Sequence, residues 1–316
     1  MKAKERTLLL LVLAAVILCA ALFWLTKTED AQDAGSLLCS LAQEDAEQLQ
    51  LKYQGETLTL LRGEDGWTLL EDPAYHLDGT ACDGMLKTLV ELAANRRFAP
   101  QEGEDYGLEQ PQLTVTLTAA GQSESFTFGA ENPVTSEVYL SRAGESELYT
   151  VPYNKVSVFQ KTKAELFGAF APAQVTASEL EQICYVLQDA TTVSLTRMQQ
   201  VSDAASEDAA DYTSVWRLTD DPAAELDETK VHGLLTALTS YVSGQITHAD
   251  PADYGFDAPS VTVTMTTAEK TARLTYASGV DGVYLMLDGD DSIYLVDLAT
   301  LNKLLYRAEG LKNGFE

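Results

Sequence analysis

Histidine and cysteine are scarce in this chain of 316 residues, with only three His and four Cys. These side chains supply most zinc and haem ligands and every disulfide bond. The small number of His and Cys residues argues against a disulfide framework and against a metal centre built from these side chains. We therefore expect no metal site and no cofactor.

Basic residues are also few, since 21 Lys and Arg stand against 48 Asp and Glu, a net charge of -27. A surface this acidic repels phosphate backbones, which excludes nucleic acid as a partner. Hydrophobic residues make up 46% of the chain, so it can bury substantial cores. The length suggests about two domains.

The longest uncharged run is Thr7–Thr26, which covers 20 residues and spans about 30 Å as a helix, the thickness of a bilayer core. Lys2, Lys4 and Arg6 precede the run, and acidic residues follow it from Glu29 onward. Because positive charge stays on the cytoplasmic side, we predict a single-pass transmembrane helix in the cell membrane. Its N-terminus would be cytoplasmic and the rest of the chain extracytoplasmic.

Two alternatives to an uncleaved anchor are a cleaved signal peptide and a lipoprotein signal. Ala20 and Ala21 are followed by the bulky residues Leu22–Trp24, which make a poor cleavage site. Cys19 follows Leu18, where a lipidated cysteine needs a small residue. We therefore expect the anchor to remain attached.

The rest of the chain contains an internal repeat. Asp72–Asp78 (DPAYHLD) matches Asp221–Asp227 (DPAAELD), and Asp105–Pro111 (DYGLEQP) matches Asp253–Pro259 (DYGFDAP) at nearly the same separation. Such a long period makes each copy domain-sized rather than one turn of a solenoid. The predicted parts are a cytoplasmic tip and anchor (1–27), a linker (28–36), repeat unit 1 (37–160), a connector (161–181) and repeat unit 2 (182–316).

Each copy combines strand patterns with one helical pattern. Apolar and polar residues alternate in several short runs, and Gln54-Gly55 lies between two of them as a hairpin turn. An apolar stripe at helical spacing follows Asp78 in the first copy and Asp227 in the second, where each Asp is placed as an N-cap. We therefore predict an α+β fold, in which each repeat is a mostly antiparallel sheet packed with one long helix. Trp67 and Trp216 should be equivalent and largely buried.

The Asp-Tyr-Gly turn recurs in both copies. Gly107 and Gly255 are expected to have positive φ, which favours glycine. Asp105 and Asp253 should accept hydrogen bonds from the turn backbone.

The order of these motifs resembles the DUF4340 family of bacterial proteins. The resemblance rests on W-x-L, D-P-A-x-x-L-D, the amphipathic helix and D-Y-G-L-x-x-P behind an N-terminal apolar run, and it covers nearly the whole remaining chain twice. The second copy departs in Phe256 and in the acidic stretch Gln199–Asp211, which we interpret as a surface loop. The resemblance implies no catalytic residues, but it implies a genomic setting beside ABC transporter subunits of the gliding-motility type.

No catalytic motif stands out. Asp78 and Asp227 recur as caps, and His76, His232 and His248 belong to no recognisable nucleophile motif. The densest oxygen-ligand cluster, Asp288–Ser292, lies between two strand patterns and is typical of an Asp-Gly hairpin turn rather than a calcium loop. We assign no catalytic, cofactor or metal-binding residue.

These observations favour a non-enzymatic, membrane-anchored extracytoplasmic accessory or binding protein that contacts the lipid bilayer and ABC transporter subunits. The alternative is a cell-envelope hydrolase that uses two carboxylates. A pair of acids with a raised pKa in one cleft would favour the hydrolase.

Overall fold

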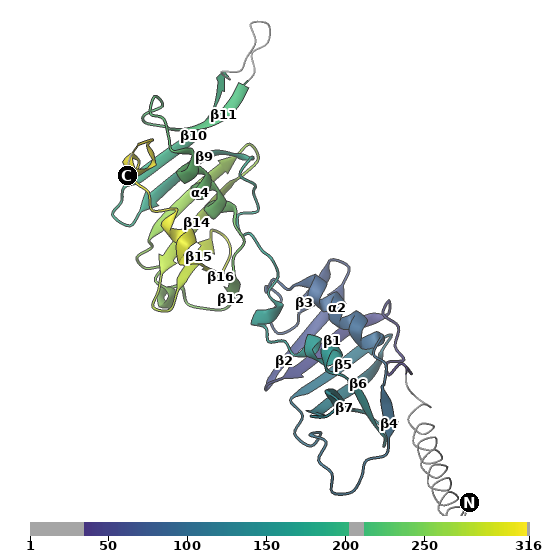
Figure 1. Cartoon of the computed structure of the whole chain (residues 1–316). Coiled ribbons are helices and arrows are strands. Elements are labelled where there is room, and N and C mark those ends of the chain that lie inside the picture. Colours follow the sequence, from purple (N-terminus) through teal and green to yellow (C-terminus); the bar gives the residue numbers. More distant parts are fainter. Residues whose placement is uncertain (1–34, 202–211, 315–316) are drawn as a thin grey trace, which may run out of the picture. The chain divides into compact units, whose positions relative to one another are not determined.

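The computed structural model describes residues 35–201 and 212–314. Their contacts divide them into two units. The first unit takes in the described residues up to Pro73 together with Gly79–Leu166, and the second takes in Ala74–Asp78 and the described residues from Phe167 onward. Figure 1 shows both units along the chain.

The first unit contains one eight-stranded sheet in the order β3-β2-β1-β5-β6-β7-β8-β4. Every neighbouring pair in it is antiparallel. The strands are β1 (Ala46–Tyr53), β2 (Glu56–Gly63), β3 (Gly66–Leu69), β4 (Arg96–Phe98), β5 (Leu113–Ala119), β6 (Gln122–Glu131), β7 (Glu137–Arg142) and β8 (Leu148–Pro152). The helices are α2 (Gly79–Val90), α3 (Tyr153–Val156) and the 3-10 turns η1 (Ser157–Phe159) and η2 (Ala164–Leu166).

The second unit repeats this plan with the order β11-β10-β9-β13-β14-β15-β16-β12. Its strands are β9 (Leu180–Leu187), β10 (Thr192–Val201), β11 (Tyr212–Leu218), β12 (Gly244–Ile246), β13 (Val261–Thr267), β14 (Thr271–Ser278), β15 (Val283–Leu287) and β16 (Ile293–Val296). Its helices are α4 (Glu228–Thr239), α5 (Leu298–Asn302) and the 3-10 turns η3 (Pro251–Tyr254) and η4 (Glu309–Leu311).

Alternation of apolar and polar residues explains the strands. Along β5, every second residue from Leu113 to Ala119 is buried and the residues between them are half-buried. The hairpin between β1 and β2 turns at Gln54 and Gly55, which have φ of 50° and 83°. Positive φ at both central residues matches the twist of the flanking strands. The predicted hairpin is confirmed.

The two three-turn helices follow the predicted apolar stripes. Cys82, Met85, Leu86 and Leu89 are buried on α2, which begins at Gly79, directly after Asp78. Asp227 caps α4, because its side chain accepts hydrogen bonds from the backbone N–H groups of Thr229 and Lys230. The predicted cap role of Asp227 is confirmed.

The predicted α+β fold with one long helix on each sheet is wrong. Each of the two units is built on an eight-stranded antiparallel sheet, and α2 and α4 have only 12 residues each. The apolar stripe after Asp78 continues beyond Val90, but the chain there leaves the helix and Ala93 forms a β-bridge with Leu37. The described fold is therefore mostly β, because strands rather than helices make up most of the regular structure in each unit.

The predicted transmembrane helix lies in residues 1–34, outside the described part of the chain. Among the helices of the described residues, none combines the length and the apolar character that crossing a bilayer needs.

Both units pair their strands in the same register. Leu51 lies opposite Val115 in the first unit, and Tyr185 lies opposite Val263 in the second. Trp67 on β3 and Trp216 on β11 lie opposite Arg62 and Arg197 respectively, so the two tryptophans are equivalent as predicted. Both rings are half-buried, however, so the expectation of large burial is wrong.

Candidate functional site

Each unit has a surface groove between the end of a strand and a short helix. In the first unit these are β6 and α3, which follows β8, and in the second unit they are β14 and α5, which follows β16. In the first unit the groove has a volume of about 360 Å³. It is lined by the turn around Gly107, the end of β6 and the segment Tyr153–Gln160. We call it the first-unit groove.

The Asp-Tyr-Gly turn is clamped onto β6 to make one wall of this groove. The N–H of Gly107 donates to Asp105 Oδ1 at 2.8 Å, and the N–H of Ala130 donates to the Tyr106 carbonyl at 2.8 Å. Gly107 has φ of 70°. The β6–β7 pairing shifts register between Phe128 and Glu131, beside the attachment point. The predicted positive φ of Gly107 and the backbone-binding role of Asp105 are confirmed.

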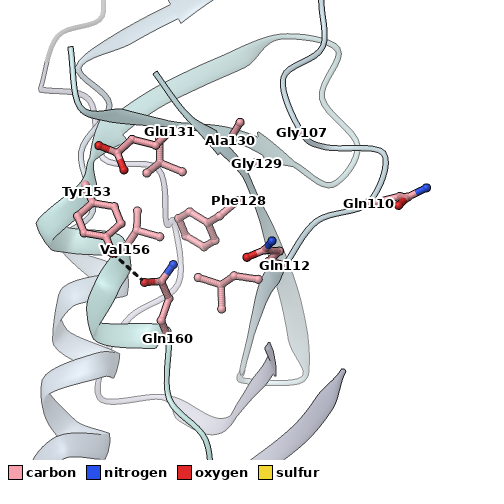
Figure 2. A pocket seen from close by; sticks show the side chains of 12 residues that line it. Gly107, Gln110, Gln112, Phe128, Gly129, Ala130, Glu131, Tyr153, Val156 and Gln160 are labelled. Carbon is pink, nitrogen blue, oxygen red and sulfur yellow. Dashed lines mark hydrogen bonds between the residues drawn. The ribbon is translucent and has the colours of Figure 1, made fainter. Parts of the chain in front are cut away.

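The opposite wall comes from α3 and the residues after it. Phe128 forms the floor and stacks on Phe159 with ring centroids 6.1 Å apart. Figure 2 shows the Tyr153 ring and the Gln160 side chain across from the strand wall. The Tyr153 hydroxyl donates to Gln160 Oε1 at 3.3 Å, which joins the two ends of this wall.

The second-unit groove has a volume of about 490 Å³. Its strand wall includes Ser260 and Ser278, and its helix wall includes Leu298, Leu301 and Leu305. These residues lie on or next to β13, β14 and α5, the elements that correspond to β5, β6 and α3 of the first unit.

Strand pairing establishes that the two grooves are equivalent. Leu113 pairs with Phe128 in the first unit as Val261 pairs with Tyr276 in the second. Val138 pairs with Val151 as Val283 pairs with Val296, which aligns the segments that follow β8 and β16. In these two registers several wall residues of one groove correspond to wall residues of the other. The corresponding pairs are Gln112 and Ser260, Ala130 and Ser278, Tyr153 and Leu298, Val156 and Leu301, and Gln160 and Leu305.

In the turn beside the second-unit groove, an Asp side chain also binds the backbone, but a different Asp of the motif region does so. Gly255 has φ of 87°, as predicted. Asp250, not Asp253, caps the turn by accepting from the N–H of Ala252 at 3.0 Å. The prediction that Asp253 binds the turn backbone is therefore wrong, because Asp250 accepts that hydrogen bond.

An aromatic pair supports the turn in both units. Tyr106 meets Tyr139 edge to face with ring centroids 4.9 Å apart, and Tyr254 meets Tyr284 in the same way at 4.9 Å. Edge-to-face pairs of this kind hold a turn in one orientation. The repeated motif thus serves to fix the strand wall of each groove.

The grooves differ in polarity. The first-unit groove carries Glu131 and several Gln side chains on its lining. In the second-unit groove, Arg307 forms an ion pair with Asp189 and donates to Thr191 Oγ1 at 3.1 Å. Hydrogen bonds from Thr191, and then Arg307, hold the pKa of Asp189 below its usual value. This carboxylate therefore stays charged.

Exposed apolar side chains lie on corresponding segments beside both grooves. Val134 is 88% exposed on the turn before β7, and Val280 is 96% exposed on the turn before β15. Each turn lies next to the helix wall, because Glu137 pairs with Pro152 and Val283 pairs with Val296. Tyr153 and Leu298, at equivalent positions on that wall, are 42% and 60% exposed. We call these exposed residues the groove rims.

The structure disperses the three histidines. His76 groups with the second unit, where its ring stacks on Phe170 at 3.6 Å. His232 is exposed on α4 and lines a cavity of about 310 Å³ beside Trp216, and His248 is exposed as well. The sequence singled out no His as catalytic, and the structure brings no two of them into contact within the described residues.

The acidic cluster Asp288–Ser292 forms the hairpin turn that the sequence predicted. Gly289 has φ of 86°, and Asp290 accepts from the N–H of Ser292 at 2.8 Å and from the hydroxyl of Tyr294 at 2.6 Å. Across the described residues, no three His, Cys, Asp or Glu side chains gather in a way that could hold a metal ion.

Sequence reasoning missed the helix walls and rims of the grooves. Val134, Tyr153, Val280 and Leu298 carry no motif, and each looked like an ordinary apolar residue of a strand or helix. The available signal was the repeat itself, since Tyr153 and Leu298 are equivalent and each copy also has a valine in the turn before β7 or β15.

The comparisons with known proteins return one match. The family model described as "Domain of unknown function (DUF4340)" matches residues 67–215 and 216–314. The two matched stretches begin at the equivalent residues Trp67 and Trp216. No curated protein and no solved structure matches the chain.

Proposed function

The chain belongs to the DUF4340 family, and we propose that it is a membrane-anchored, extracytoplasmic accessory protein that binds a partner protein through its two grooves. In this proposal it is not an enzyme. The partner is a membrane transport complex, in keeping with the ABC transporter setting that the family resemblance implies.

The recurrence of the groove rims carries this proposal. Exposed apolar residues add little to folding, because water still contacts them in the folded state. Contiguous exposed apolar surface marks sites of interaction with other proteins. Val134 and Tyr153 in one unit, and Val280 and Leu298 in the other, place such residues beside a groove of the same construction.

The charge of the chain indicates the chemistry of the partner. With a net charge of -27, and with Glu131 on the lining of the first-unit groove, the protein attracts basic surfaces. The proposed partner surface therefore offers apolar side chains to the grooves and carries Lys or Arg around them.

Attachment to the membrane rests on the sequence of Thr7–Thr26, which lies outside the described residues. The charges that flank this run support an arrangement with the bulk of the chain outside the cytoplasm. Protease treatment of intact protoplasts tests this arrangement. Digestion of the acidic region is expected, and full protection of it would reverse the topology.

Affinity capture of the full chain from membranes tests the binding role. Transporter subunits should be recovered with the unchanged protein, and their recovery should fall with Leu298→Asp and with Val134→Asp. Tyr241→Asp is the matched control, because it adds the same charge at a residue that is also exposed but lines neither groove. It should leave recovery unchanged.

Two results would overturn the proposal. The first is transporter recovery that none of the groove variants changes. The second is hydrolysis of a wall polymer by the purified chain in a manner that one carboxylate substitution abolishes, which would establish the hydrolase.

A further inference from the structure

In the first unit a carboxylate is held at one end of the sheet by the segment that enters it. Glu124, on β6, accepts from the backbone N–H of Ser40 at 3.2 Å and from the Ser40 hydroxyl. Arg142 Nη2 lies 3.4 Å from the same carboxylate. The Glu124 side chain is only 18% exposed, so this is a built carboxylate site that the chain fills with its own acid.

The second unit lacks that acid. Leu117 pairs with Glu124 as Met265 pairs with Ala272, so Ala272 stands in the place of Glu124. Phe126 pairs with Arg142 as Leu274 pairs with Leu287, so a leucine replaces the arginine. The short side chain of Ala272 leaves room where the first unit places a carboxylate.

A cavity of about 450 Å³ occupies this place in the second unit. Ala272 and Leu287 line it, together with Pro172–Gln174 from the segment that leads into the sheet. Its volume is within the range of small-molecule sites. The first unit has filled the corresponding place with the Glu124 and Arg142 side chains.

In the second unit, the positive charge at this place comes from residues that do not correspond to Arg142. Lys270 lines the cavity, and its ammonium donates to the carbonyls of Ala173 at 3.2 Å and Gln174 at 2.9 Å. An ammonium has three donors, so one N–H of Lys270 remains after these two bonds. Arg273 lines the same cavity. Within residues 35–201 and 212–314, neither Lys270 nor Arg273 forms an ion pair.

We propose that this cavity of the second unit binds a carboxylate group supplied by a ligand, in the place that Glu124 occupies in the first unit. Lys270 holds the carboxylate through its remaining N–H, and Arg273 adds positive charge. The carboxylate belongs either to a free small carboxylic acid or to an acidic side chain of a peptide.

The net charge of the chain does not prevent such binding. At physiological salt, charges beyond about 8 Å are largely screened, so the local cations dominate. The lining contains Lys270 and Arg273 against the acid Asp288, and outside the lining the charge of Glu179 also acts on Lys270. Charge-assisted hydrogen bonds to a carboxylate are about twice as strong as neutral ones.

Isothermal titration of the full chain in detergent tests the proposal. The probes are N-acetyl-glutamate amide, which reproduces the Glu124 side chain, and N-acetyl-glutamine amide as its uncharged match. The charged probe should bind with a dissociation constant on the order of 1 mM, and the uncharged probe should bind at least about tenfold more weakly. Succinate and a Glu-containing hexapeptide distinguish a free acid from a peptide as the source.

Three variants test whether the carboxylate binds in this cavity. Ala272→Glu supplies an internal carboxylate as in the first unit and should abolish binding. Lys270→Met should weaken binding about tenfold. Glu124→Ala should open the equivalent place of the first unit, where Arg142 remains, and add a second binding event.

Thermal melts show which variants keep the fold. If Ala272→Glu does not fold, Lys270→Met still tests the proposal, because Lys270 is exposed. Unchanged binding of the charged probe in Lys270→Met, or equal binding of the two probes, would overturn the proposal.

Discussion

Gly107 lies so close to Ala130 that a side-chain carbon added to the glycine would stand 2.6 Å from the Ala130 backbone nitrogen. The same position has φ of 70°, which side chains rarely adopt. The Ala130 N–H also donates a hydrogen bond to the Tyr106 carbonyl, which holds the turn against β6. In the second unit, a carbon added to Gly255 would stand 2.7 Å from the carbonyl oxygen of Ser278. The strand wall of each groove therefore requires glycine.

Gly107→Ala should lower the free energy of unfolding of the first unit by about 1–3 kcal/mol, the usual range for a strained backbone position. Gly103→Ala is the control, because Gly103 has φ of +88° but no atom near its added carbon. The control carries the cost of φ without the collision, so it should cost less. Chemical denaturation measures both, and an equal cost would show that contact with Ala130 contributes nothing.

Asp227→Ala should destabilise the second unit by about 1 kcal/mol through loss of the N-cap of α4. Its carboxylate now accepts from the N–H of Thr229 at 2.9 Å and of Lys230 at 3.2 Å. Asp227→Asn should keep most of the stability, because the amide oxygen caps as well as a carboxylate. If the Asn and Ala variants were equally destabilised in denaturation, the charge rather than the cap would be the cause.

His76 should make the second unit less stable in mild acid. Burial against Phe170 lowers the pKa of His76 below 6.5, although the charge of Asp290 acts in the opposite direction. Folding thus favours the neutral ring, and its contribution is complete above 6.5 and is lost as the pH falls through the folded pKa.

The measurement compares the wild-type protein with His76→Gln, which cannot take up a proton at this position. Unfolding free energies are measured from about pH 7.5 to about pH 5. The advantage of the wild type over the variant should shrink as the pH falls. An advantage that stayed constant or grew would contradict the direction of this pKa shift.

The cysteines should differ in reactivity. Cys39 and Cys82 are buried and Cys184 is half-buried, and none of these three forms a disulfide bond. Burial also raises the pKa of the Cys39 thiol, which lowers its thiolate fraction. In a Cys19→Ser background, an aromatic disulfide reagent should label Cys184 first under native conditions. Labelling of Cys82 at the same rate would show that α2 opens readily.

Features set by neighbouring residues were predictable. The hairpin at Gln54-Gly55, the cap at Asp227 and the positive φ of Gly107 all depend on short stretches whose chemistry allows few alternatives. The repeat was predictable for a different reason, since it needs only a comparison of the sequence with itself. The length of the helix was not, because the apolar residues after Val90 suit a helix and an extended segment equally well.

The sequence by itself determined that this chain is an acidic protein with two copies of one unit, and it determined the turns and caps of each copy. Only the tertiary structure decided that each copy is an eight-stranded sheet, and where its grooves and cavity lie. Ser40 and Glu124, and likewise Lys270 and Ala173, are distant in sequence. Their proximity follows from strand order and register, which depend on how all the strands bury their apolar faces together.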